Sequence, residues 1–210
     1  GCELIYCPEG RFGVFEEKGK GKQVHQLVVL CKSQLGYQNL SKLLTQAFLD
    51  GVNNKVNSSD LARGVVDREL LDKYGDGLIV LSGCIGGEVG DALRQGQYDQ
   101  AKEVASWYKK IFGDRYYIEV QDHGHPDHPG HWTEQKGVND QLFTLAKELD
   151  IPVVVTCDAH YLRHEDQEAH EILLCVQTGS FLSDEKRMSL KEFELHVTDP
   201  NELIKRWGKT

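Results

Sequence analysis

The stretch IPVVVTCDAH, residues 151–160, decides the expected fold of this chain. Within it, the β-branched run from Val153 to Thr156 has the length and composition of a buried strand. Asp158 and His160 follow this run at once, and apolar residues with helical spacing precede it, at Val138, Leu142, Leu145, Ala146 and Leu149. The order of helix, buried strand and polar loop predicts an α/β unit with its reactive side chains at the carboxyl end of the strand.

The same order recurs earlier in the chain. Three further apolar runs of strand length are separated by segments with helical spacing: Val24 to Leu30, Leu78 to Leu81 and Tyr116 to Val120. Such strands imply parallel pairing through crossovers in a sheet that is covered on both faces. We therefore expect a barrel or a doubly wound α/β fold. Both gather functional residues at strand ends, and five candidates lie there: Cys84, Asp122, His123, Asp158 and His160.

The alternation of strands and helices ends near residue 179. Residues 180–192 are polar and charged, and the short apolar run Phe193 to Val197 follows them. We therefore expect one domain over residues 1–179, and a linker with the start of the following region over residues 180–210. The first helix of that region is expected from Pro200 to Trp207.

Composition narrows the class of protein. With 210 residues, 40% of them hydrophobic, the chain can form one ordinary domain. Its net charge of -9, from 33 acidic and 24 basic residues, disfavours direct binding of nucleic acid by this segment. The sequence motifs of P-loop proteins, serine hydrolases and HExxH metalloproteases do not occur in it.

The cysteines and the lengths of the apolar runs predict the cellular compartment of the protein. The six cysteines include no C-x-x-C pair, which disfavours a zinc ribbon or a disulfide framework and favours a reducing cytosol. No apolar run reaches the roughly 18 residues of a membrane-spanning helix, and no basic and apolar leader opens the chain. We expect a cytoplasmic protein without a membrane partner. Because a strand-like run follows Gly1 at once and Met188 is the only methionine, we also expect a piece of a longer chain.

Several residues could bind a metal, each with a structural alternative. Asp158 and His160 place a carboxylate and an imidazole in one loop, as a metal-dependent hydrolase needs, but they could equally cap a helix and fill a core. Cys84, next to Gly83, could ligate zinc as a thiolate or pack as a small hydrophobe. Glu3, within an apolar strand, needs a metal or an arginine as its partner.

Histidines provide further candidates. His25 begins a strand and could point to either face of the sheet. The run from His123 to His131 could bind transition metals, although its prolines and glycines favour a solvated loop for His125, His128 and His131. His123 lies nearest the strand end, so both interpretations stay open for it.

Six segments together resemble, in order, the polymerase-and-histidinol-phosphatase (PHP) domain of bacterial DNA polymerase III alpha subunits: GCELIYC, HQLVVLCKSQLGYQNLSKLL, GLIVLSGCIGGEV, WYKKIFGDRYYIEVQDHG, IPVVVTCDAHYL and EDQEAHEILLCVQTG. The resemblance covers about Gly1 to Gly179, and the DxxRM pattern from Asp184 to Met188 resembles the family's exit from the domain. It implies a distorted (βα)7 barrel, here partial because its first strands are missing, with a cluster of up to three divalent metals such as zinc or manganese.

The resemblance implies metal roles for five residues. Glu3 would be the bridging carboxylate, His25 and Cys84 would complete the shell of one metal, and Asp158 and His160 would serve the neighbouring metals. The family's first ligands, beginning with an H-x-H pair, would lie upstream of Gly1. Two departures from the family pattern are extra residues around 127–133 and Cys157 in place of a common Asn.

The resemblance also implies a function for the whole protein. It would be a DNA-directed DNA polymerase that uses magnesium and deoxynucleotides, with its catalytic acidic residues beyond Thr210, so this chain would hold none of them. The chain itself would be a metal-dependent 3′-5′ exonuclease or a structural brace. Implied partners are DNA, the sliding clamp and the proofreading subunit. The alternatives are a free-standing, histidinol-phosphatase-like phosphoesterase and an inactive binding scaffold.

Overall fold

The computed structural model describes residues 1–12, 23–51, 64–124 and 129–208. They form two compact units, Gly1–Glu119 with Leu142–Val153 and Val120–Gln141 with Val154–Thr210. His125, His128 and the side chain of His131 lie outside the described part of the chain. Within the described ranges, no helix has the length and apolar character needed to cross a membrane.

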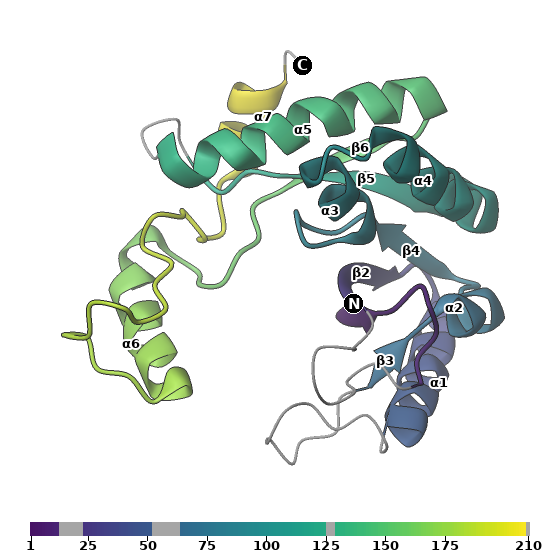
Figure 1. Ribbon diagram of the computed structural model, residues 1–210, viewed down its shortest axis with the longest axis horizontal. Helices are drawn as coiled ribbons and strands as arrows, with labels where there is room; N and C mark the ends of the chain where they lie inside the picture. Colours follow the sequence, from purple (N-terminus) through teal and green to yellow (C-terminus); the bar gives the residue numbers. More distant parts are fainter. Residues whose placement is uncertain (13–22, 52–63, 125–128, 209–210) are drawn as a thin grey trace. The chain divides into compact units, whose positions relative to one another are not determined.

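The described residues of the first unit form the strands β1 to β4 and the helices α1 to α4 (Figure 1). They are β1 (Cys2–Tyr6), β2 (His25–Cys31), β3 (Val65–Val66), β4 (Leu78–Leu81), α1 (Gln34–Gly51), α2 (Arg68–Tyr74), α3 (Glu88–Arg94) and α4 (Tyr98–Phe112). Helix α1 packs with α2 and contacts β2, β3 and β4, whereas α3 packs with α4. Asp67 begins α2 as its cap, because its Oδ1 accepts a hydrogen bond from the amide of Leu70 at 3.1 Å.

Three elements run through both units: β5 (Tyr116–Gln121), α5 (Pro129–Leu149) and β6 (Val153–Thr156). The second unit adds α6 (Gln167–Thr178) and α7 (Pro200–Trp207). Two short 3-10 helices, η1 (Gly113–Arg115) and η2 (His164–Asp166), precede β5 and α6. The helix predicted from Pro200 to Trp207 is therefore confirmed. Residues on both sides of Gly179 belong to the second unit, and the domain boundary expected there stays a prediction.

The strands pair in the order β3-β1-β2-β4-β5-β6. The α/β class is confirmed, and the sheet of the described residues ends at β3 and β6 without closing, as expected of a partial barrel. The expectation of parallel pairing throughout is wrong, because β2 is antiparallel to both β1 and β4, whereas β1–β3 and β4–β5 are parallel. Antiparallel neighbours need no helical crossover, and residues 7–24 between β1 and β2 carry no helical spacing of apolar residues.

The core of the first unit is built on buried aromatic rings. Tyr6, Tyr108 and Tyr116 are at most 1% exposed, and the ring centroid of Tyr108 lies 6.1 Å from that of Tyr6 and 5.1 Å from that of Tyr116. Leu27 and Val80 are also buried, on β2 and β4. Each fully buried apolar side chain of this kind contributes about 1.5–3 kcal/mol, so this core fixes the strands from which Glu3 and the loop of Cys84 extend.

Candidate metal site residues

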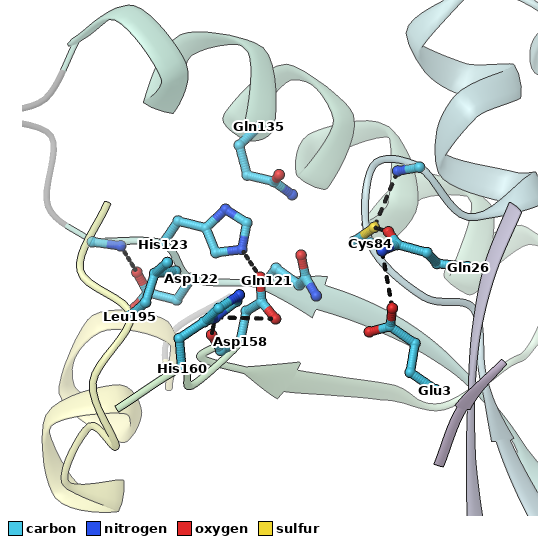
Figure 2. Close-up of polar contacts among 12 residues, drawn as sticks. Glu3, Gln26, Cys84, Gln121, Asp122, His123, Gln135, Asp158, His160 and Leu195 are labelled. Carbon is cyan, nitrogen blue, oxygen red and sulfur yellow. Dashed lines mark hydrogen bonds and ion pairs between the residues drawn. The ribbon is translucent and has the colours of Figure 1, made fainter. Parts of the chain in front are cut away.

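Glu3 and Cys84 lie at the two ends of a short hydrogen-bonded chain in the first unit. The Nε2 of Gln26 donates to Oε1 of Glu3 at 2.9 Å, and the thiol of Cys84 donates to Oε1 of Gln26 at 2.6 Å. The amide of Gly86 donates to Sγ of Cys84 at 3.2 Å. Figure 2 shows Gln26 between the other two side chains. One amide side chain therefore orients both a carboxylate and a thiol, which are ligand types for zinc.

Glycines bring the loop of Cys84 close to β2. Gly83 has φ +81°, and a Cβ atom there would lie 2.7 Å from the carbonyl oxygen of Gln26. A Cβ atom at Gly87 would lie 2.4 Å from the carbonyl oxygen of Ser82. Because a side chain at either position would collide with backbone, the loop needs glycine to place Cys84 beside Gln26.

His25 points to the face of β2 opposite the one that carries Gln26 and its hydrogen bonds to Glu3 and Cys84. In the antiparallel pair of β1 and β2, Glu3 is opposite Val28 and Tyr6 is opposite His25. Paired residues share a face and successive residues alternate, so Glu3 and Gln26 share one face while His25 points to the other. The structure thus brings Glu3 and Cys84 together through Gln26, and it does not bring His25 to them.

The ring of His25 instead lines a small polar pocket. The pocket has a volume of about 100 Å³, and its walls include Glu88, Asp91 and Gln95. His25 is 9% exposed, and its Nδ1 lies 3.3 Å from the carbonyl oxygen of Gly86. A ligand role for His25 stays a prediction of the family resemblance.

In the second unit, His123 and Asp158 form a pair. Nε2 of His123 lies 3.2 Å from Oδ2 of Asp158, and Figure 2 shows the imidazole directed at the carboxylate. Nδ1 of His160 lies 2.7 Å from the carbonyl oxygen of Asp158 and 4.0 Å from its Oδ1. The structure therefore brings Asp158 and His160 together, as the D-x-H spacing predicted, and adds His123 to them.

The charge of Asp158 is stabilised by its neighbours. Burial opposes ionisation of this carboxyl, but the hydrogen bond and charge of His123, together with the charge of His160, lower its pKa below the ordinary value. Asp158 is thus an anion at neutral pH. Its backbone is left-handed, with φ +45°, a conformation that Asp tolerates better than most residues.

Helix α5 and the end of β6 support the strand end before His123. The amide of Asp122 donates to the carbonyl oxygen of Thr156 at 2.8 Å. Nδ2 of Asn139, a fully buried side chain, donates to the carbonyl oxygen of Gln121 at 2.9 Å. These contacts hold the ends of β5 and β6 side by side, which is why residues 35 positions apart meet in the pair of His123 and Asp158.

The donor types fit a divalent metal. Nε2 of His123 is buried and lies 3.2 Å from Oδ2 of Asp158. Imidazole, carboxylate and thiolate groups are the usual ligands of zinc, and imidazole and carboxylate also suit manganese. In the described ranges, however, no three His, Cys, Asp or Glu side chains are arranged as a metal site. Glu3 and Cys84 in the first unit, and His123, Asp158 and His160 in the second, are therefore described as two separate groups of candidate ligands.

The sequence did not predict a role for Gln26, and it left both interpretations open for His123. Gln26 has no strong chemical signal, but alternation along β2 would have placed it on the face of Glu3 once the strand pairing was known. His123 was left open because its loop is rich in histidine, although its place at the end of β5 distinguished it from His125, His128 and His131.

The fold and the site residues can be compared with known proteins. A family model described as "PHP domain" matches residues 1–123, which is more than half of the chain. The chain belongs to the PHP domain family.

Curated proteins similar to this chain include three bacterial DNA polymerase III alpha subunits. The chain is 39% identical over 204 residues to the DNA polymerase III subunit alpha of Treponema pallidum, 37% identical over 193 residues to that of Deinococcus radiodurans, and 37% identical over 203 residues to that of Thermus aquaticus. The matches cover 97%, 90% and 97% of the chain, respectively. They cover only 16%, 13% and 15% of the relatives, so the chain spans about a seventh of their length.

Proposed function

We propose that the chain is the PHP domain of a replicative DNA polymerase III alpha subunit and that it binds divalent metal ions. The observation that carries this proposal is the extent of the matches. Eight relatives named DNA polymerase III subunit alpha are 31% to 39% identical to the chain and match 87% or more of it, including residues beyond the PHP match at 1–123. A free-standing, histidinol-phosphatase-like phosphoesterase would have no reason to share those further segments.

In this proposal the whole protein is a DNA-directed DNA polymerase of the bacterial cytoplasm. It would extend DNA with deoxynucleotides by magnesium-dependent phosphoryl transfer at acidic residues outside residues 1–210, and it would work with a sliding clamp and a proofreading subunit. The net charge of -9 supports a role for this chain other than gripping the DNA backbone.

The proposed metal ligands are Glu3 and Cys84 in the first unit, and His123, Asp158 and His160 in the second unit. A bound zinc or manganese ion would lower the pKa of a coordinated water and so supply a nucleophile for 3′-5′ hydrolysis of a phosphodiester. Asp158 contributes an anion that is already charged at neutral pH. Gln26 holds the side chains of Glu3 and Cys84 in place. If the domain has no hydrolytic role, the same residues would bind metal as a structural brace.

The test uses the intact polypeptide and its Asp158→Asn variant. Metal content after dialysis and release of nucleotides from 3′-labelled single-stranded DNA are measured, with Asp114→Asn as the control because the side chain of Asp114 is 87% exposed. We expect Asp158→Asn to lower metal content and the control to retain it. Nuclease activity lost with the metal would identify an exonuclease, whereas metal without such activity would identify a brace. An intact protein that binds no zinc or manganese would overturn the proposal.

A further inference from the structure

The segment after α6 returns to both loops that carry the second unit's proposed ligands. The amide of Glu194 donates to the carbonyl oxygen of His123 at 2.9 Å, and the amide of His160 donates to the carbonyl oxygen of Leu195 at 2.8 Å. Tyr161 and His196 form an isolated parallel bridge beside these bonds. One short stretch of backbone therefore connects the loop of His123 to the loop of Asp158 and His160.

Helix α7 then makes a second attachment at Asp122, the residue before His123. Oδ2 of Asp122 accepts hydrogen bonds from Nε1 of Trp207 at 2.9 Å and from Nη1 of Arg206 at 3.2 Å. Its Oδ1 accepts from the amide of Gly124 at 3.0 Å. The side chain of Asp122 is 1% exposed, so it depends on these donors for the solvation that water would otherwise supply.

Polar contacts attach α7 to Asp122. None of its residues is fully buried, and Ile204 is 66% exposed. Arg206 also contacts Glu202 at 2.6 Å and Glu194 at 3.5 Å, so one guanidinium joins Asp122 to the returning segment. Because Arg206 and Trp207 both bind the buried carboxylate of Asp122, α7 restrains that carboxylate and the loop that follows it.

We propose that Trp207 and Arg206 are positioning residues for His123. By holding Asp122, they fix the loop from which the His123 imidazole reaches Asp158, so the affinity of this pair for a divalent ion depends on α7. The inference rests on the proposed metal-binding function. It extends that function to α7, whose Arg206 lies 84 residues after Asp122 in the sequence.

Trp207→Phe is the most direct test, because it keeps an aromatic ring and removes the indole donor. Binding of zinc and of manganese to the purified protein is measured by calorimetry in competition with a chelator. We expect an affinity about 10–100-fold weaker, the usual effect of removing an outer hydrogen-bond partner in a metal site. Trp107→Phe is the matched control, since Trp107 lies in the first unit, where its ring contacts Tyr108. Arg206→Gln is a second variant in case Trp207→Phe does not fold.

A double-mutant cycle separates positioning from a general loss of stability. In a His123→Ala background, Trp207→Phe should have no further effect on metal affinity, because its effect passes through His123. Wild-type affinity in both folded variants, or an equal loss of affinity in the two backgrounds, would overturn the positioning role while leaving the proposed function intact. A wild-type protein that binds neither metal would overturn the proposed function and this inference with it.

Discussion

Glu171, which is buried, and Arg187, which is partly exposed, form an ion pair that connects α6 to the chain that follows it. Nη1 of Arg187 lies 2.6 Å from Oε2 of Glu171, and the two side chains are 11% and 1% exposed. The same carboxylate accepts hydrogen bonds from the hydroxyl of Ser189 and the amide of Leu190, each at 2.8 Å. The arginine of the DxxRM pattern thus has a structural task, which is to hold the returning segment against α6.

Removal of the carboxylate of this pair should be destabilising. Glu171→Ala would remove the carboxylate that accepts hydrogen bonds from Arg187, Ser189 and the amide of Leu190, so the free energy of unfolding should fall. Glu168→Ala, at an exposed position of the same helix, serves as the control and should change stability little. Urea unfolding of both variants measures the difference. Equal stability of the two would show that the pair contributes little.

The same carboxylate should make stability depend on pH. Burial opposes its ionisation, but the Leu190 amide, Arg187 and Ser189 lower the pKa of Glu171 below its ordinary value. A carboxyl with a lowered pKa in the folded state stabilises fully above its unfolded pKa, about 4.3, and loses this contribution as pH falls through the folded pKa. The difference in stability between wild type and Glu171→Gln should therefore be largest near neutral pH and should shrink as pH falls below about 4.3. A difference that stays constant from pH 7 to pH 3 would contradict this.

The thiolate of Cys84 should be needed for zinc to bind at Glu3 and Cys84 in the first unit. Cys84→Ser keeps the size of the side chain but replaces the thiolate ligand, so zinc affinity should fall by more than the roughly 10–100-fold typical of an outer partner. Cys175→Ser is the matched control, because Cys175 is buried on α6 in the second unit. Zinc is measured after dialysis against a chelator-buffered solution. Retention of wild-type zinc by folded Cys84→Ser would make Cys84 a packing residue.

Substitutions of Gln26 and of its neighbour His25 should affect zinc affinity differently. Gln26→Ala removes the amide that orients Glu3 and Cys84, and we expect zinc affinity to fall about 10–100-fold. His25→Asn changes the other face of β2 and should leave that affinity unchanged. Titration of both variants with zinc distinguishes the two faces. The reverse order of effects would restore His25 as a ligand and exclude the positioning of Cys84 by Gln26.

The features of the fold that could be predicted are those that depend on residues close together in the sequence. The α/β class, the strand before Asp158 and the helix from Pro200 to Trp207 follow from local spacing, and the structure contains all three. The face to which His25 points could not be predicted, because it depends on which residue of β1 lies opposite and that register is set by long-range pairing.

The contact between Trp207 and Asp122 was equally inaccessible. It joins two polar groups 85 residues apart, and no periodic pattern of apolar residues indicates such a contact. The pairing of His123 with Asp158 lies between these cases. The sequence predicted that each residue follows the end of a strand, but only the sheet order makes β5 and β6 neighbours.

The left-handed backbone of Asp158 restricts which amino acids this position accepts. Asparagine adopts this conformation readily and matches the shape of aspartate, so Asp158→Asn removes the charge and leaves the path of the loop unchanged. Asp158→Glu keeps the charge, but glutamate enters this region less readily and its longer side chain moves the carboxylate away from His123. The residue that looks chemically closest is therefore the less faithful replacement, because geometry at this position is as demanding as charge.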